Sequence, residues 1–206
     1  NCSSSEPGNS VKTAHCEACN MPTHAPDNSF SNHFLVALNS SGLAKDYFCD
    51  TISLLIDHNQ EGAFGLVINR PLALTLADLL PGFEQPILCP VLEGGPVEPE
   101  RLFFLHTAER QYAGTLNISE TIALSTSNDL LADLKSGNTP AHIVAVLGYA
   151  GWGSGQLERE LAETIWQLTP THADIVFTAP FTERRNQATA LLGVDLNLIN
   201  PAAGYD

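Results

Sequence analysis

The stretch Leu147-Gly148-Tyr149-Ala150-Gly151-Trp152-Gly153-Ser154-Gly155-Gln156-Leu157-Glu158 lies between an apolar run and an amphipathic one, and it decides the fold. Four of the eight residues 148–155 are glycines. Because glycine has no Cβ, such a density is tolerated where the backbone turns with positive φ or lies close to another backbone or a ligand. We predict a tight turn that lets Trp152 pack over neighbouring backbone. A loop that contacts a ligand is the alternative.

The segments on either side of this loop predict its place in the fold. Residues 142–149 form a nearly continuous apolar run, which is typical of a central strand covered on both faces. Leu157, Leu161 and Ile165 then recur at helical spacing and predict an amphipathic helix. Further strands are predicted at residues 33–38, 51–56, 63–69, 87–92, 101–106, 121–125 and 174–178, and further helices at 75–80, 128–135 and 182–192. This irregular mixture favours a single α+β domain with a mixed β-sheet flanked by helices.

Local signals predict several of the boundaries. Residues 59–62 form a connection of hairpin size between two predicted strands. Thr75 and Asp78 have the spacing of a capping box at the start of a short helix. Gly137 is placed to end the helix at 128–135. In the last helix, the side chains of Ala188, Leu191 and Leu192 are predicted to face inward, and Gly193 is placed to end it.

The charge of the chain limits its partners. Lys and Arg number 9 against 23 Asp and Glu, a formal net charge of -14, so nucleic acid and anionic lipid are repelled over most of the surface. The longest apolar run, at residues 143–152, is about ten residues long, against roughly 18 for a membrane span. We therefore expect a cytoplasmic protein that binds neither nucleic acid directly nor a membrane.

The first residues read as an extension of the domain. Met21 is the only methionine and precedes a polar, proline-containing lead-in, so we expect it to be the natural start. Residues 1–31 are then a disordered or non-native extension, and residues 32–206 form the domain. His15, Cys16, Cys19 and His24 resemble half of a zinc site, but the composition favours a disordered tail, and we assign no metal. Cys49 and Cys89 are expected to be free thiols in a reducing compartment.

Named catalytic and nucleotide-binding motifs fail on the glycine-rich stretch. It lacks the Gly-Lys-Ser/Thr ending of a P-loop, and Gln156 stands where both a dinucleotide-binding loop and a nucleophile elbow require glycine. No two histidines have the helical spacing of a metal site. We assign no catalytic residue and no cofactor, and we expect a non-enzymatic protein.

Two further turns could join the glycine loop in one binding site. Asn69 and Arg70 stand where a predicted strand ends, a common position for carboxylate or phosphate recognition. Gly94 and Gly95 predict a second tight turn. If these turns converge with the loop, the site for a small anion or nucleotide-type ligand consists of Asn69, Arg70, Gly94, Gly95, Gly151, Trp152, Gly155 and Gln156. A salt bridge from Arg70 to Glu93 or Asp78 is the favoured alternative for the arginine.

With these segments, the chain resembles the AlgH/YqgE family of bacterial proteins over about residues 32–206. The resemblance rests on three blocks in order: Glu61-Gly62-Ala63-Phe64-Gly65-Leu66-Val67-Ile68-Asn69-Arg70-Pro71, then Gly94-Gly95-Pro96-Val97, then the stretch 147–158. It implies a single α+β domain whose split, mixed sheet is curled into a pseudo-barrel. The family often has a cysteine where this chain has Ile56, which puts a thiol-dependent site there in doubt.

The resemblance also implies a class of function. The family is named for a proposed role in transcriptional regulation of exopolysaccharide synthesis and has no established enzymatic activity. We expect a cytoplasmic, non-enzymatic regulatory or interaction protein that acts through a protein partner or a small effector. The alternatives are a binder of, or an enzyme acting on, a small anionic ligand in the region of Arg70, Gly94-Gly95 and 151–156, and a structural homo-oligomer paired through an apolar edge strand.

Overall fold

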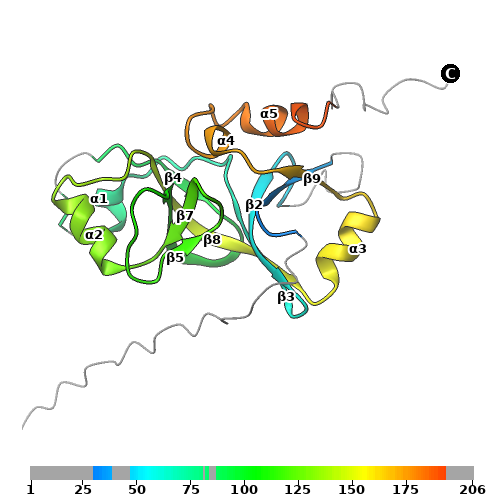
Figure 1. Cartoon of the computed structure of the whole chain (residues 1–206), viewed down its shortest axis with the longest axis horizontal. Coiled ribbons are helices and arrows are strands. Elements are labelled where there is room, and N and C mark those ends of the chain that lie inside the picture. The colour runs from blue at the N-terminus through cyan, green and yellow to red at the C-terminus, as the bar shows by residue number, and fades with distance from the viewer. Residues whose placement is uncertain (1–29, 39–46, 81, 84–86, 194–206) are drawn as a thin grey trace, which may run out of the picture.

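The computed structural model describes residues 30–38, 47–80, 82–83 and 87–193 (Figure 1). Met21, the candidate zinc ligands from His15 to His24, and the tail predicted for residues 1–31 up to residue 29 lie outside the described residues. The strands are β1 (His33–Ala37), β2 (Ile52–Asn59), β3 (Gly62–Val67), β4 (Val91–Glu93), β5 (Val97–Thr107), β6 (Leu116–Asn117), β7 (Ile122–Ser125), β8 (Ile143–Gly153) and β9 (Trp166–Pro170). The helices are α1 (Leu76–Leu79), α2 (Asn128–Lys135), α3 (Gln156–Ala162), α4 (Ala173–Phe177) and α5 (Arg184–Ala190).

The strands form one mixed sheet in the order β6-β7-β5-β8-β3-β2-β1-β9, with β4 paired to β8 beside this path. Neighbouring strands are antiparallel, except that β4 and β8 are parallel. The β2–β3 hairpin pairs Asn59 with Gly62, which confirms the predicted connection. The capping box of Thr75 and Asp78 and the helix at 128–135 are confirmed as well.

Strand β8 belongs to both halves of this sheet. Its residues from Ile143 to Tyr149 pair with β5, and its residues from Ala150 to Gly153 pair with β3. The change of partner falls at Gly148, whose φ is +69°. Glycine is required there because a Cβ would lie 2.5 Å from the carbonyl oxygen of Gly95. The predicted central strand is thus confirmed, but it is longer than predicted, and the turn is confined to Ser154 and Gly155.

The bend at Gly148 lets one core run through both halves. Val144 and Val146 belong to the largest cluster of buried side chains, and Tyr149 packs against the same cluster. In a regular strand, Tyr149 would lie on the opposite face from Val146, because side chains alternate. The irregularity at the glycine therefore keeps the inner face apolar across the junction and curls the sheet around it.

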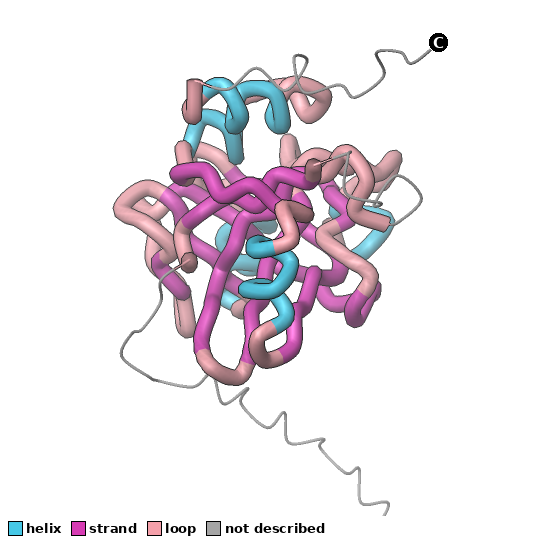
Figure 2. The backbone as a smooth tube through the Cα atoms, turned by 90° about the vertical axis from the view of Figure 1, so that its right-hand side faces the viewer, coloured by secondary structure: helices cyan, strands magenta, loops and turns pink. Residues whose placement is uncertain are grey.

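Helices cover the rest of the sheet. Side chains of α1 and α2 pack in a second cluster with β5 and the first half of β8, while α3 packs in a third cluster with Trp152 and Trp166. Side chains of α4 and α5 join the inner core. Figure 1 shows α1 and α2 at one end of the molecule and α3 at the other, with α4 and α5 above the strands. Figure 2 shows α3 lying in front of the strands when seen from its own side.

Two predicted elements near the C-terminus are wrong. Residues 174–178 were predicted as a strand, but they lie in and just after helix α4, where Ile175 and Val176 are buried against the core. The predicted helix through Ile165 ends at Ala162, because Thr164 takes a positive φ of 58° and the chain enters β9. Leu191 was predicted to face inward, yet it is 48% exposed. A short apolar run is compatible with a helix or a strand. The strand that pairs with β1 is Trp166–Pro170, and the apolar run after it forms helix α4 instead.

The structure confirms a single α+β domain with a curled, mostly antiparallel sheet flanked by helices. Within the part of the chain that the structure describes, no helix has the length and apolarity to span a membrane.

Candidate functional site

Gly94 and Gly95 lie directly against β8. The N–H of Gly94 donates to the carbonyl of Leu147 at 2.7 Å, and the carbonyl of Gly94 accepts from the N–H of Val67 at 2.8 Å. A Cβ on Gly95 would lie 2.0 Å from the carbonyl carbon of Tyr149. The second and third sequence blocks therefore meet through close contact between backbones, and a ligand has no room between them.

Asn69 and Arg70 hold a neighbouring segment of backbone. The side-chain amide of Asn69 donates to the carbonyl of Asp50 at 2.9 Å and accepts from the N–H of Ile52 at 3.1 Å. The Arg70 guanidinium donates to the carbonyls of Tyr47 and Cys49 and stacks 4.5 Å from the centre of the Tyr47 ring. These contacts tie residues 47–52 to the end of β3.

The predicted salt bridge of Arg70 is wrong. Among the described residues, no ion pair joins its guanidinium to Glu93 or Asp78. Glu93 instead donates its backbone N–H to the carbonyl of Arg70 at 2.9 Å, and Asp78 accepts from Thr75 at the start of α1. Burial and the nearby Glu93 carboxylate raise the pKa of Tyr47 to about 12, so this phenol stays neutral beside the arginine.

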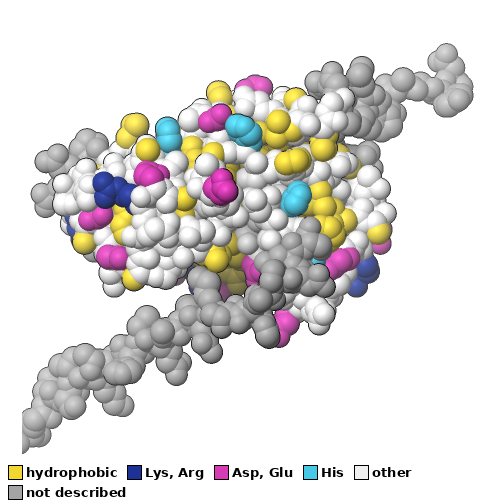
Figure 3. Space-filling model, viewed as in Figure 1, with side chains coloured by type: hydrophobic (Ala, Val, Ile, Leu, Met, Phe, Trp, Pro, Cys, Tyr) yellow, Lys and Arg dark blue, Asp and Glu magenta, His cyan; other side chains and the backbone are white. Residues whose placement is uncertain are grey.

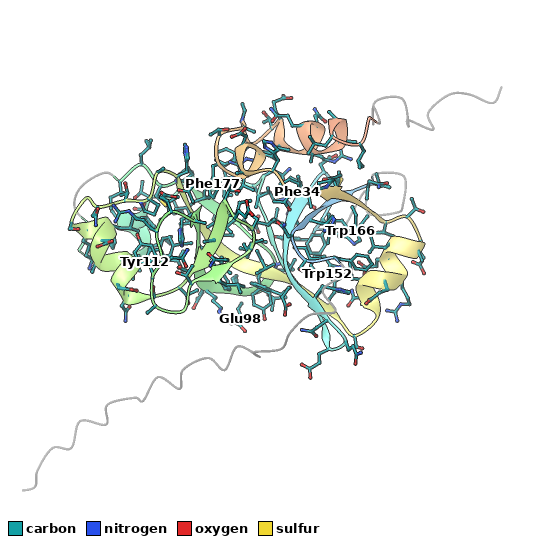
Figure 4. All side chains as sticks on the ribbon, in the orientation of Figure 1. Phe34, Glu98, Tyr112, Trp152, Trp166 and Phe177 are labelled. Atoms are coloured by element: carbon teal, nitrogen blue, oxygen red, sulfur yellow. The ribbon has the colours of Figure 1, made fainter. Side chains whose placement is uncertain are left out.

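Trp152 and Gln156 build the contact between β8 and α3. Trp152 is 5% exposed, and its indole N–H donates to Glu160 Oε2 at 2.9 Å. The indole of Trp166 donates to the same oxygen at 2.7 Å. Gln156 donates to Glu160 Oε1 at 2.8 Å and accepts from the N–H of Gly153 at 3.0 Å. Figure 4 shows both tryptophans close to α3, and Trp152 is a core residue.

The predicted binding residues are distributed along the sheet and do not surround one point. Gly62 at the start of β3 pairs with Gly153, next to the turn that contains Gly155 and to Gln156, the first residue of α3. Arg70 lies eight residues further along from Gly62, roughly 25 Å at the rise of an extended chain. Gly94 and Gly95 lie between these two ends, against Gly148 and Tyr149.

Two predicted site residues have an open environment: Gly155, in the turn with a positive φ of 68°, and Gly151, inside β8. Gly151 is exposed and has no positive φ, so its extended backbone suits any residue. A Cβ there would meet only the Tyr149 ring at 3.5 Å and the Val97 side chain at 4.0 Å. Glycine inside a strand lowers stability and often marks a place where another backbone or a ligand approaches. In the part of the chain that the structure describes, no contact requires glycine at this position.

The backbone of Gly151 lies on an unpaired side of the sheet. Within the described residues, the pairing of β5 with β8 ends at Tyr149, so residues 150–153 have β3 as their one strand neighbour. The N–H of Gly153 points away from β3, because it donates to the Gln156 side chain. The N–H of Gly151, two residues earlier, points the same way, since orientation alternates along a strand. We call residues 150–153, on the side away from β3, the open edge.

Aromatic side chains adjoin the open edge. Phe64 is the cross-strand partner of Gly151, and its ring centre lies 5.1 Å from that of Tyr149. Both rings are partly exposed, and Val97 beside them is 37% exposed. The open edge thus combines unpaired backbone with apolar contact area, as sheet edges that receive a further strand do.

Two β-bulges place carboxylates near these rings. The irregularity between Leu55 and Asp57 puts Asp57 opposite Phe64, on the same face of the sheet. The larger irregularity between Val97 and Leu102 projects residues 98–101, with Glu98 at a positive φ of 44°. Glu98 accepts from the Tyr149 hydroxyl at 3.4 Å and from Arg101 at 3.1 Å. Bulges are frequent beside functional sites because they redirect side chains.

Sequence reasoning missed Asp57, Phe64, Glu98 and Tyr149 as members of a site. The alternation of Tyr149, Gly151 and Gly153 on one face was a usable signal, since two glycines at alternate positions leave that face bare beside the tyrosine. The bulges had no local signal, because they depend on pairing between distant strands.

The buried histidines have structural partners. Because a carbonyl can only accept, His106 Nδ1 donates to Thr107 at 3.0 Å, and its Nε2 accepts from Ser125 Oγ at 2.9 Å. Burial lowers the pKa of His106. Ser125 and His106 are paired as a nucleophile and its base would be, but they are 1% and 0% exposed and enclosed in the fold. His58 contacts Glu158 of α3 at 2.9 Å. No group of His, Cys, Asp or Glu among the described residues is arranged to hold a metal ion.

Fold and site define a class: single α+β domains whose curled sheet turns on a glycine-rich strand shared by both halves. The profile of the AlgH-like family matches residues 34–197, and the chain belongs to this family, as the sequence resemblance predicted.

Solved and curated relatives agree with this assignment. The chain is 41% identical over 181 residues to a UPF0301 protein of Methylococcus capsulatus, covering 85% of this chain and 95% of that protein. It is 41% identical over 192 residues to one of Stutzerimonas stutzeri, covering 90% and 100%. The solution structure of the AlgH protein from Pseudomonas aeruginosa superposes with a TM-score of 0.70 at 38% identity, covering 90% of this chain and 100% of that one. A Corynebacterium diphtheriae protein, at 18% identity and a TM-score of 0.61, shares the fold.

Proposed function

We propose that this AlgH-like chain is a non-enzymatic, cytoplasmic regulatory protein that acts through a protein partner. The partner adds an extended segment to the open edge of β8. An effect on transcription is then indirect, because a chain with a formal net charge of -14 repels the DNA backbone.

The observation that carries this proposal is the exposed glycine in the open edge. Among the described residues, Gly151 has no strand partner on the side away from β3; it also has no Cβ to hinder approach, and two aromatic rings lie beside it. Strand addition uses main-chain hydrogen bonds for affinity and side-chain pockets for specificity, and the edge supplies both.

A pair of substitutions at one position tests the proposal. Gly151→Pro removes the N–H donor of the open edge, whereas Gly151→Ala keeps the donor and its Cβ fits at the 3.5 Å and 4.0 Å distances given above. Each allele would replace the chromosomal gene of this family in a bacterium that carries one, and transcripts would be compared with those of a deletion strain. We expect the proline allele to reproduce the deletion profile at normal protein abundance and the alanine allele to match wild type. A wild-type profile from the proline allele would refute this use of the edge.

The alternative of a small anionic ligand has less support. It requires Arg70 and Gln156 to act together, and they stand near opposite ends of β3. Nη2 of Arg70 already donates to the Tyr47 and Cys49 carbonyls, and both polar groups of the Gln156 amide are engaged. A thermal-shift titration with nucleotides and inorganic phosphate tests it, since a stabilisation that Arg70→Ala abolishes would favour the ligand.

A further inference from the structure

We propose that the segment received by the open edge is basic, with Lys or Arg alternating with apolar residues. This inference rests on the proposed function and adds the chemistry of the partner. It follows from the charges and rings around residues 150–153, and from the side on which an added strand would lie.

The geometry of the edge requires an extended partner. A chain that pairs with the N–H of Gly151 lies parallel or antiparallel to β8, in line with β5 and beyond its first residue, Val97. Its side chains then alternate between the face of Phe64 and Tyr149 and the opposite face. A helix cannot present its main chain in this way, because its own N–H and C=O groups are paired internally.

The charges beside the edge favour a cationic partner. Glu98 and the exposed Glu100 lie in the irregularity of β5 next to Tyr149, whereas Asp57 lies further away, in β2, where it accepts from the Asn59 amide. The one guanidinium among them, that of Arg101, is already held by Glu98 and lies 5.1 Å from the centre of the Phe103 ring. A carboxylate in the added strand would meet like charge, whereas a Lys or Arg would meet opposite charge.

The aromatic rings favour the same partner. Phe64 and Tyr149 are partly exposed and lie beside carboxylates, and aromatic rings beside carboxylates attract an ammonium or guanidinium group through both cation–π and ionic contact. Apolar residues between the charged ones would cover Val97 and the bare surface at Gly151. On the face seen in Figure 3, acidic side chains are spread widely while Lys and Arg show mainly near the two ends, so long-range attraction would assist a basic segment.

Three labelled peptides test this chemistry on the full chain: alternating Lys and Val, alternating Glu and Val, and alternating Lys and Ser. Binding is measured by fluorescence anisotropy at physiological ionic strength, and amide shifts of the isotope-labelled protein locate it. We expect the Lys-Val peptide to bind about tenfold or more tightly than either other peptide, with shifts centred on residues 149–153. Equal binding of the Glu-Val peptide, or shifts centred elsewhere, would overturn the inference.

Variants separate the edge from its charges. Gly151→Pro should weaken the Lys-Val peptide by about tenfold or more, and Gly151→Ala should not. Glu98→Gln and Glu100→Gln leave the backbone edge in place, so each should weaken the Lys-Val peptide several-fold without strengthening the Lys-Ser peptide. Should the proline variant fail to fold, these charge variants still decide the matter. Displacement of the peptide by an equal concentration of spermidine would instead indicate a site for small cations and refute strand addition.

The two proposals can fail separately. If the proline allele behaves as a deletion while the Lys-Val peptide binds no better than the Glu-Val peptide, the partner site stands and its basic chemistry is wrong. If the peptide binds as described while the proline allele behaves as wild type, the edge binds basic strands but does not serve the regulatory function.

Discussion

The contact between Gly148 and Gly95 offers a quantitative test of how the sheet is joined. Gly148→Ala would introduce a Cβ 2.5 Å from the Gly95 carbonyl oxygen and 3.1 Å from that of Val97, at a φ of +69°. Gly137→Ala is a matched control, because Gly137 has a φ of +78° and no atom within 4 Å of its Cβ position. Both substitutions place alanine in the left-handed region of φ, but only the Cβ of Gly148→Ala would also clash with neighbouring backbone atoms.

The difference between the variants isolates the steric contribution. The left-handed conformation costs a non-glycine residue about 1–2 kcal/mol in either variant. Replacing glycine by alanine also reduces the conformational entropy of the unfolded chain, which stabilises both variants by about 0.4–1 kcal/mol. Overpacking adds about 1–3 kcal/mol at Gly148 alone, since the atoms contacted are backbone and cannot rotate away. We therefore expect Gly148→Ala to lower the free energy of unfolding by about 1–3 kcal/mol more than Gly137→Ala does.

Urea unfolding followed by far-UV circular dichroism measures this difference. With a dependence of about 1–3 kcal/mol per molar urea, the two midpoints should differ by about 1 M. Equal midpoints would refute the reasoning, because they would mean that Gly95 moves aside freely and that the junction is not closely packed. A reduced urea dependence in Gly148→Ala would instead indicate that the two halves no longer unfold together.

The remaining predictions concern buried polar groups. Glu160→Ala leaves two buried indole N–H groups without their acceptor and should lower the free energy of unfolding by about 2–4 kcal/mol. Glu163→Ala, at an exposed position, is the control and should change the free energy of unfolding by less than about 0.5 kcal/mol. Because both tryptophans of the chain lie at this site, tryptophan fluorescence measures its unfolding directly. Burial lowers the pKa of His106, so the unfolded chain takes up its proton first, and stability should fall as the pH drops from about 6.5 towards that lowered pKa. Thermal melts between neutral and acidic pH should lose this slope in His106→Asn and keep it in His142→Asn, and an unchanged slope in both would contradict the assignment.

Local signals in the sequence were sufficient for much of the fold. The hairpin at 59–62, the capping box at Thr75 and the helix at 128–135 each depend on neighbouring residues, and each is confirmed. The apolar run before Gly148 identified the central strand. These features need no knowledge of distant contacts.

The open edge could not be predicted because it depends on strand pairing. Alternation alone would carry Asp57 away from the inner face of β2, and the bulge before it returns it to that face. The pairing of β5 with β8 is interrupted between Val97 and Leu102, where β5 has three more residues than β8, and these residues look like an ordinary turn in the sequence. Arg70 was predicted to need a carboxylate, whereas main-chain carbonyls of a segment far away in sequence satisfy it.

Strand β8 keeps two registers with a single length of chain. One inserted or deleted residue between Ile143 and Gly148 would shift every β5 partner, and one between Ala150 and Gly153 would shift every β3 partner and turn Trp152 out of its core. Related chains should therefore vary in length at their surface loops while this segment keeps a constant residue count. Side chains of this segment can be substituted during evolution, but the number of residues from the buried valines to the tryptophan cannot change, because both ends are held in register by different partner strands.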